Sequence, residues 1–164
     1  MTRGEKNNNP LNIRHSADQW QGAAVEQTDK SFVQFTTMAY GYRAAWKVLQ
    51  SYYNHFMHEG KQFTVRNIIY RWAPPSDNNA TEAYIRKVLQ ISGIGGKENQ
   101  LPPNNVNSYG RLSKMIAAMT CIECGMSLSR VDDEAICNGY HLAFSENKKQ
   151  LNEWLRGEDE YADW

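Results

Sequence analysis

Met115-Ile-Ala-Ala-Met-Thr-Cys-Ile-Glu-Cys-Gly125 is a strongly apolar stretch that carries a single carboxylate, Glu123. Apolar side chains recur within it and just before it at three- and four-residue spacing, which predicts a helix over about residues 107–123. These side chains are Leu112, Met115, Ile116, Met119 and Ile122. Gly125 is expected to end the helix, because glycine readily adopts the left-handed conformation that closes a last turn.

Amphipathic patterns on both sides of this stretch predict further helices. Residues 42–58 place apolar side chains on one face before Gly60, and residues 65–72 follow Thr64, a good N-cap. Another helix is expected from residue 79 or 81 to near Gly93, and the next one begins at Asp132-Asp133-Glu134, where negative charge favours the helix dipole. A long surface loop over residues 94–105 and a last amphipathic turn at Leu151, Trp154 and Leu155 complete this prediction.

The first forty residues have a different pattern, with turn residues between short β-type runs. Residues 12–15, 23–28 and 31–35 are predicted as strands of a small antiparallel sheet. The expected fold class is therefore α+β but mainly α, with this sheet near the N-terminus and about six helices. We find no repeat or linker, so residues 1–164 are expected to form a single domain.

Composition excludes several classes of protein. The 164 residues include 18 Lys+Arg and 18 Asp+Glu, a net charge of zero that argues against a nucleic-acid partner. No apolar run approaches the ~20 residues of a membrane span, and the N-terminus lacks the apolar region of a signal peptide. Three cysteines are an odd number, and without export features we expect them to stay reduced.

Aromatic residues make up 12% of the chain, with five Trp and nine Tyr, and Asn is abundant. Aromatic rings can stack on the apolar faces of sugars while amide side chains bond to sugar hydroxyls. This combination favours a carbohydrate ligand.

Two motifs carry a family resemblance. Arg3-Gly-Glu-Lys-Asn-Asn-Asn-Pro-Leu-Asn-Ile-Arg14 and Arg71-Trp-Ala-Pro-Pro75 resemble a family of bacteriophage and prophage virion proteins with an Asn-Asn-Pro-Gly-Asn-Ile-Arg opening and an Arg-Trp-Ala-Pro-Pro motif. Lytic members of that family look like peptidoglycan-cleaving enzymes of the lysozyme-like superfamily. The resemblance covers about residues 3–145. This chain has Leu11 where Gly is usual and Asp77 where Glu is more common.

The opening motif, followed by Trp20-Gln-Gly22, also resembles flagellar-type N-acetylglucosaminidases, in which this stretch helps to form the sugar cleft. The resemblance implies a set of substrate-binding residues and a bracing role for Arg71, Trp72 and Pro74. The implied substrate-binding residues are Asn8, Asn9, Asn12, Trp20 and Gln21.

Two glutamates compete for the role of catalytic acid, which must stay protonated near neutral pH through burial against apolar walls. Glu5 stands four residues before Asn9-Pro10, a spacing similar to that in lytic transglycosylases. Glu123 ends the apolar helix, which resembles the Glu-Ser-Gly helix end of the superfamily, with Ile122 and Cys124 in place of flanking His and Asn. A helix C-terminus disfavours a carboxylate, which favours Glu123 physically. If Glu123 is the acid, the cleft-forming segment comes first and the acid-bearing helix last, as in a circular permutation.

A second carboxylate would distinguish the possible reactions. A hydrolase needs one to activate water or to attack the sugar, whereas a lytic transglycosylase can use a single acid/base with the muramic acid 6-hydroxyl as nucleophile. Asp29 and Asp77 are candidates, with Glu26 also available.

Cys121, Cys124, Cys137 and His141 have a zinc-finger spacing. The first pair, however, ends an apolar helix rather than lying on a hairpin, so core positions are the simpler interpretation and no metal is expected. Glycosidic cleavage needs no cofactor.

These observations predict cleavage of the MurNAc–GlcNAc linkage of peptidoglycan during phage infection or lysis. The expected partners are glycan strands and other virion proteins. The expected location is the virion or the bacterial cytoplasm, with action on the host cell wall. The alternative is a non-catalytic virion structural or wall-binding module on the same fold.

Overall fold

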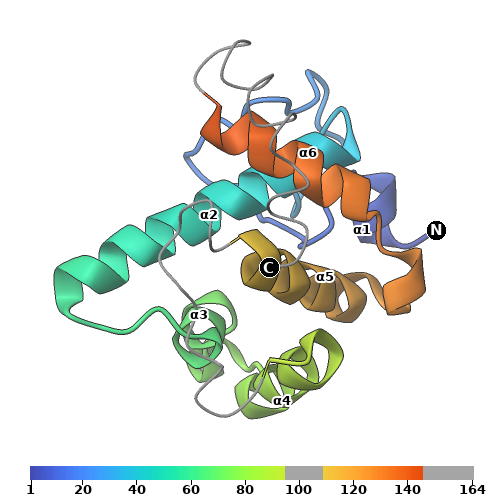
Figure 1. Ribbon diagram of the computed structural model, residues 1–164. Helices are drawn as coiled ribbons and strands as arrows, with labels where there is room; N and C mark the ends of the chain where they lie inside the picture. The colour runs from blue at the N-terminus through green and yellow to red at the C-terminus, as the bar shows by residue number, and fades with distance from the viewer. Residues whose placement is uncertain (95–108, 146–164) are drawn as a thin grey trace.

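A computed structural model describes residues 1–94 and 109–145 of the chain. Within these ranges the structure consists of α-helices and two short 3-10 helices joined by loops (Figure 1). The elements are α1 (Arg3–Lys6), α2 (Met38–Glu59), α3 (Val65–Trp72), η1 (Pro75–Asp77), α4 (Thr81–Ser92), α5 (Tyr109–Cys124), η4 (Leu128–Arg130) and α6 (Asp133–Phe144).

The predicted N-terminal sheet is wrong, and with it the α+β class: the described part of the chain is helical and contains no strand. Only two isolated antiparallel bridges, Arg14 to Phe32 and Ala23 to Phe35, occur where three strands were expected. A few backbone hydrogen bonds join these segments, such as that from the Val33 N–H to the Ile13 carbonyl at 3.0 Å, and side chains bond to other backbone groups. The Asn9 amide donates to the carbonyls of Ile13 and Val33 at 2.9 and 2.8 Å, an example of local side-chain bonds competing with a ladder.

Capping residues set the helix bounds much as the sequence indicates. Helix α3 covers the predicted residues 65–72, with the Thr64 hydroxyl accepting from the Asn67 N–H at 3.1 Å. Helix α2 begins four residues earlier than predicted, because Thr37 caps it by accepting from the Tyr40 N–H. Gly125 adopts a φ of 61° just after α5, as expected for the residue that ends it.

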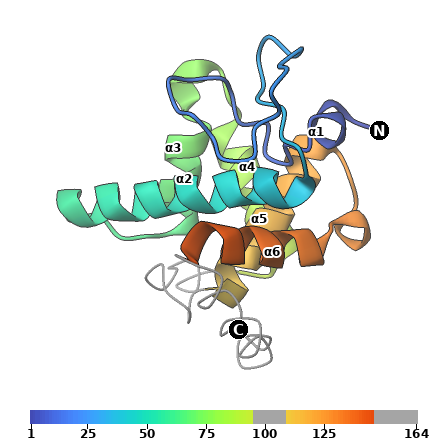
Figure 2. The ribbon, with the colours of Figure 1, turned by 90° about the horizontal axis from the view of Figure 1, so that it is seen from above.

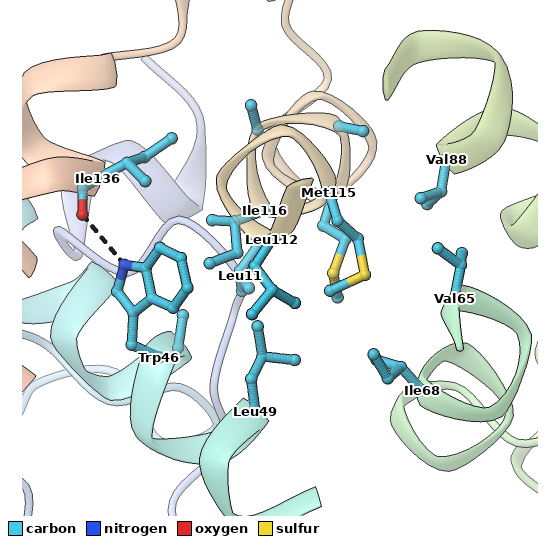
Figure 3. Packing of buried hydrophobic residues seen from close by; sticks show 14 of the residues in the cluster. Leu11, Trp46, Leu49, Val65, Ile68, Val88, Leu112, Met115, Ile116 and Ile136 are labelled. Atoms are coloured by element: carbon cyan, nitrogen blue, oxygen red, sulfur yellow. Dashed lines mark hydrogen bonds between the residues drawn. The ribbon is translucent and has the colours of Figure 1, made fainter. Parts of the chain in front are cut away.

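The buried core is built around α5, ten of whose sixteen residues are buried. Figure 1 shows α6 crossing α2 on one side of α5 and α3 with α4 on the other, and Figure 2 shows α6 running beside α2. One cluster of buried side chains includes Trp46 of α2, Val65 of α3, Ile116 of α5 and Ile136 of α6 (Figure 3). The Trp46 indole N–H donates to the Ile136 carbonyl at 3.0 Å, which fixes α6 against α2.

Leu11, which replaces the glycine typical of the resembling family, enters this core from the N-terminal loop and is 2% exposed. It thereby anchors the loop to the helices. The predicted loop over residues 94–105, apart from Ile94, and the predicted turn at Leu151, Trp154 and Leu155 lie outside the described residues. Among the described helices, none combines the length and the apolar character needed to cross a membrane.

Candidate functional site

A pocket of about 590 Å³ is lined by the N-terminal loop, α2, α3, the segment from Ala73 to Asn79, α4 and the end of α5. Its walls combine aromatic side chains with amides and carboxyl groups. The aromatic ones are Trp20, Phe32, Tyr52, Trp72 and Tyr84. Flat apolar rings beside hydrogen-bonding amides are the surface that a sugar ring requires.

Glu123 is the carboxyl group that α5 delivers to this pocket. It is half-buried in the last turn of the helix, and its pKa is raised because burial disfavours the charged form. Hydrogen bonding from Trp72 and Asn12 and the positive charge of Arg14 oppose this rise only in part. The Asn12 amide also donates to the Glu123 backbone carbonyl at 3.2 Å, which ties the N-terminal loop to the helix end. Glu123 is therefore a carboxyl group placed to hold its proton to higher pH than an exposed glutamate.

Tyr84, on α4, also lines this pocket and interacts electrostatically with the charge of Glu123. Burial and that charge raise its pKa well above the ordinary value, and its contact with the Trp72 side chain offsets this only partly. The hydroxyl is consequently a neutral group that can donate a hydrogen bond.

Three of the pocket residues carry a buried polar atom without a well-formed hydrogen bond to any described residue. These atoms are Asn12 Oδ1, Trp20 Nε1 and Tyr84 Oη. Buried polar atoms are nearly always satisfied, so such a concentration around one pocket indicates bonds left for a ligand or for ordered water.

Glu5, the other predicted acid, does not line this pocket. Its carboxylate accepts from the Thr2 N–H at 2.7 Å in a capping box and pairs with Arg130 at 2.9 Å. Hydrogen bonds from Thr2, more than the charge of Arg130, lower its pKa. A carboxylate stabilised in its charged form is a poor proton donor, so geometry and electrostatics both favour Glu123.

The structure divides the predicted substrate-binding residues. Asn12 and Trp20 line the pocket, whereas Asn8, Asn9 and Gln21 do not. Asn9 is fully buried and holds loop backbone groups, and the Asn8 amide donates to the Phe35 carbonyl at 3.1 Å. The two amides hold the loop in shape instead of facing the pocket.

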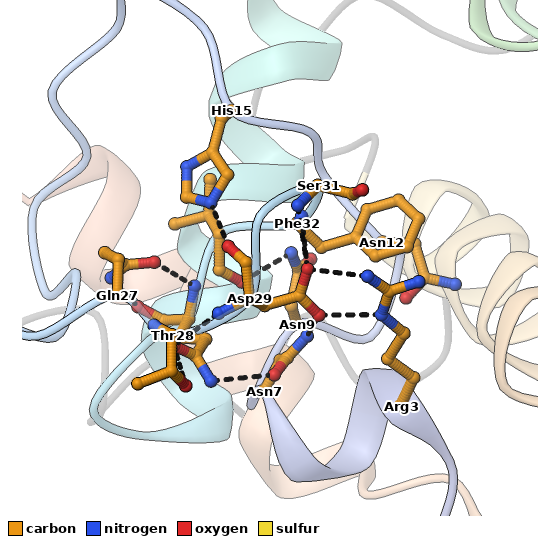
Figure 4. Close-up of polar contacts among 12 residues, drawn as sticks. Arg3, Asn7, Asn9, Asn12, His15, Gln27, Thr28, Asp29, Ser31 and Phe32 are labelled. Atoms are coloured by element: carbon orange, nitrogen blue, oxygen red, sulfur yellow. Dashed lines mark hydrogen bonds and ion pairs between the residues drawn. The ribbon is translucent and has the colours of Figure 1, made fainter.

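Of the two predicted second carboxylates, only one lines the pocket. Asp77, at the end of η1, lines the pocket, but Asp29 does not. Asp29 accepts two hydrogen bonds of 2.7 Å from Arg3 and one of 2.9 Å from Asn7 (Figure 4). These bonds, led by those from Arg3, hold its pKa well below the usual range. Asp29 thus organises the N-terminal loop.

Sequence reasoning missed several pocket residues. Asp18 and Asn79 line the pocket although their sequence surroundings resemble ordinary turns. Tyr84 falls within the helix predicted from residue 79 or 81 to near Gly93 but is not among the predicted site residues, because the polar surroundings of its hydroxyl depend on residues distant in the chain.

Three residues were expected to brace the site, among them Arg71 and Trp72. Trp72 lines the pocket, whereas Arg71 is exposed and lies over the Tyr52 ring, 5.1 Å from its centroid.

The residues with zinc-finger spacing occupy the interior. The three cysteines are buried, the Cys124 thiol donates to the Pro10 carbonyl at 3.3 Å, and Cys137 Sγ lies 3.5 Å from His141 Nε2. Over residues 1–94 and 109–145, no three His, Cys, Asp or Glu side chains are grouped as a metal site would require.

Comparison with known proteins relates the chain to a bacteriophage protein. It belongs to the family of Protein P5 of Pseudoalteromonas phage PM2, to which it is 33% identical over 145 residues, covering 87% of this chain and 82% of the relative. No protein-family model matches the chain.

Proposed function

We propose that this phage protein cleaves the MurNAc–GlcNAc glycosidic linkage of bacterial peptidoglycan, with Glu123 as the general acid. The observation that carries the proposal is the half-buried Glu123 carboxyl, with its raised pKa, inside a pocket walled by aromatic and amide side chains. A protonated carboxyl beside a sugar-sized apolar surface is the central requirement of glycosidic cleavage.

In this mechanism the Glu123 carboxyl gives its proton to the glycosidic oxygen as the bond from that oxygen to the anomeric carbon breaks. The departing sugar leaves as an alcohol, and positive charge develops on the ring that remains. Trp20 and Trp72 supply stacking surfaces, while Asn12 and the Tyr84 hydroxyl bond to sugar substituents. The Glu123 carboxylate then takes a proton from the group that attacks the anomeric carbon.

The attacking group distinguishes two forms of this reaction. Asp77 and Asp18 line the same pocket and supply a carboxylate that can activate water in a hydrolase. If the muramic acid 6-hydroxyl attacks instead, Glu123 suffices and the product carries a 1,6-anhydro ring. Mass spectrometry of the released fragments separates the two, since hydrolysis leaves reducing ends.

Membership in the family of a phage protein supports a role during phage infection or lysis, with the virion as the site of delivery. The resemblance of the opening and Arg71–Pro75 motifs to lytic virion proteins of the lysozyme-like superfamily supports the same role.

The proposal is tested by clearing of purified peptidoglycan suspensions with the full chain. We expect wild type to clear the suspension and Glu123→Gln to lose at least about 100-fold of that rate, the usual contribution of a general acid. Glu5→Gln is the matched control and should keep the rate, because Glu5 lies outside the pocket. A wild-type chain that sediments with peptidoglycan without clearing it would indicate a wall-binding module and refute the enzymatic proposal.

A further inference from the structure

A second pocket, of about 450 Å³, adjoins the candidate site along α2. The two pockets share the lining residues Asp18, Trp20, Val48 and Tyr52, so they adjoin each other, and we refer to the two together as the groove. A polymer bound at Glu123 can therefore extend past Trp20 into the second pocket. What this pocket adds to the groove is a pair of cations, Arg43 and Lys47.

Arg43 and Lys47 stand four residues apart on α2, where side chains lie on the same face of a helix. Like charges at this spacing are destabilising. Both side chains are half-buried, and neither forms an ion pair with any residue in the described part of the chain. Burial lowers the pKa of Arg43, and burial together with the charge of Arg43 lowers the pKa of Lys47. The pair is thus costly to the folded protein without a counter-charge.

The N–H groups of Arg43 and Lys47 also have few hydrogen-bond partners. Arg43 Nε is buried and has no hydrogen-bond partner among the described residues. Lys47 Nζ has only a long bond of 3.4 Å to Gln50 and a position over the Phe144 ring, 5.4 Å from its centroid. Asp18, the carboxylate in the shared wall, is bonded to the Ser16 hydroxyl at 3.1 Å. A half-buried guanidinium beside an ammonium, with unpaired donors such as Arg43 Nε, is an arrangement that can bind a carboxylate.

We propose that Arg43 and Lys47 form an anion subsite that binds carboxylates carried on the sugar strand whose glycosidic bond lies at Glu123. The inference rests on the proposed function and specifies its substrate: a glycan bearing negative charge, as distinct from a neutral polymer of N-acetylglucosamine. In peptidoglycan such carboxylates belong either to the lactyl ether of MurNAc or to the peptide attached to it.

The test is calorimetric binding of the full chain to three oligosaccharides of equal length at low salt. The first is a neutral N-acetylglucosamine oligomer, the second a peptide-free MurNAc–GlcNAc oligomer with lactyl carboxylates, and the third the same oligomer with its peptides. We expect wild type to prefer the charged oligomers about tenfold or more, and raised salt to weaken that preference. Preference for the second oligomer assigns the lactyl group, and preference for the third alone assigns the peptide.

The Arg43→Gln/Lys47→Gln double variant should bind the neutral oligomer as wild type does and lose the preference. Arg86→Gln/Lys87→Gln removes two exposed cations of α4 with the same change of net charge, and should keep it. Melting curves check that each variant is folded. If the double variant is unfolded, the exchange variant Arg43→Lys/Lys47→Arg is measured in its place. This variant keeps both charges and should keep the preference for the charged oligomers. Absence of binding to either charged oligomer, or a preference that survives the double variant, would overturn the inference. Binding does not require turnover. A failure of the anion subsite therefore appears in the binding measurements, whereas a failure of the proposed function appears as unchanged clearing by Glu123→Gln.

Discussion

The amide nitrogen of Asn12 lies 3.2 Å from the backbone carbonyl oxygen of Glu123, joining two residues that are 111 positions apart in the chain. Asn12 belongs to the N-terminal loop and has a φ of 52°, which places its backbone in the left-handed region. One side chain thus joins the end of α5 to the N-terminal loop, which lines the same pocket. We expect the position of the candidate acid to depend on this contact.

Replacing Asn12 with glycine and with alanine separates the side chain from the backbone. Asn12→Gly keeps the left-handed backbone and removes the amide, so we expect roughly a tenfold loss of clearing rate with a small loss of stability. Asn12→Ala should lose the same activity and a further ~1 kcal/mol of unfolding free energy, because Cβ disfavours positive φ. Asn8→Gly is the control: Asn8 also has a positive φ, 49°, but lies outside the pocket, so its activity should match wild type. Equal activity of Asn12→Gly and wild type would show that the amide does not position Glu123.

The raised pKa of Glu123 predicts how stability depends on pH. The folded protein binds the Glu123 proton more tightly than the unfolded chain, whose value is near 4.5. This contribution to stability is fully present below 4.5 and is lost as the pH rises through the raised pKa. The melting temperature of wild type should therefore fall relative to Glu123→Gln as the pH increases from about 4 to about 8. A constant difference between the two melting curves would show that Glu123 has an ordinary pKa.

Local sequence signals predicted the helices well, because caps and apolar spacing act within one or two turns. Thr64, Gly60 and Gly125 mark helix ends that the structure reproduces. The predicted sheet failed for the opposite reason: short β-type runs between turn residues indicated strands, but many backbone groups there bond to Asn9, Asp29 and other side chains, and only isolated bridges form. Periodicity alone does not reveal such competition.

The candidate site shows the same division between local and distant information. The apolar helix pattern singled out Glu123 as one of two candidate acids, and the opening motif singled out Asn12 and Trp20, which line the same pocket as Glu123. The roles of Asp29 and Asn9 could not be read in this way, since Asp29 meets Arg3 across 26 residues. In the sequence, Arg43 and Lys47 have the pattern of an ordinary solvated helix surface. Only the structure shows the pocket that they line.

Asp29 predicts a loss of stability at acid pH. Its folded-state pKa is lowered from 3.8, chiefly by hydrogen bonds from Arg3, so its contribution is present above 3.8 and is lost as the pH falls through the lowered pKa. Asp29→Asn should therefore melt at a lower temperature than wild type near neutral pH and approach it as the solution is acidified. Glu26 is an exposed residue of the same loop, and Glu26→Gln also removes one negative charge. This variant should melt at the same temperature as wild type at each pH. Melting curves between about pH 7 and about pH 2 measure this, and an unchanged gap would contradict it.

The crossing of α6 over α2 depends on Gly139. A Cβ atom at this position would lie 2.7 Å from Tyr42 Cβ, 2.8 Å from the Arg43 nitrogen and 2.9 Å from the Ala39 carbonyl oxygen. Two of these atoms are backbone, so the helices must separate to accept a methyl group, and we expect Gly139→Ala to cost about 1–3 kcal/mol of unfolding free energy. Asn138→Ala, an exposed neighbour on α6, should change stability little. Denaturant titration of both variants measures the difference. Because the backbone of Arg43 is one of the groups displaced, Gly139→Ala should also weaken the preference for charged oligomers, an effect that Asn138→Ala should not share.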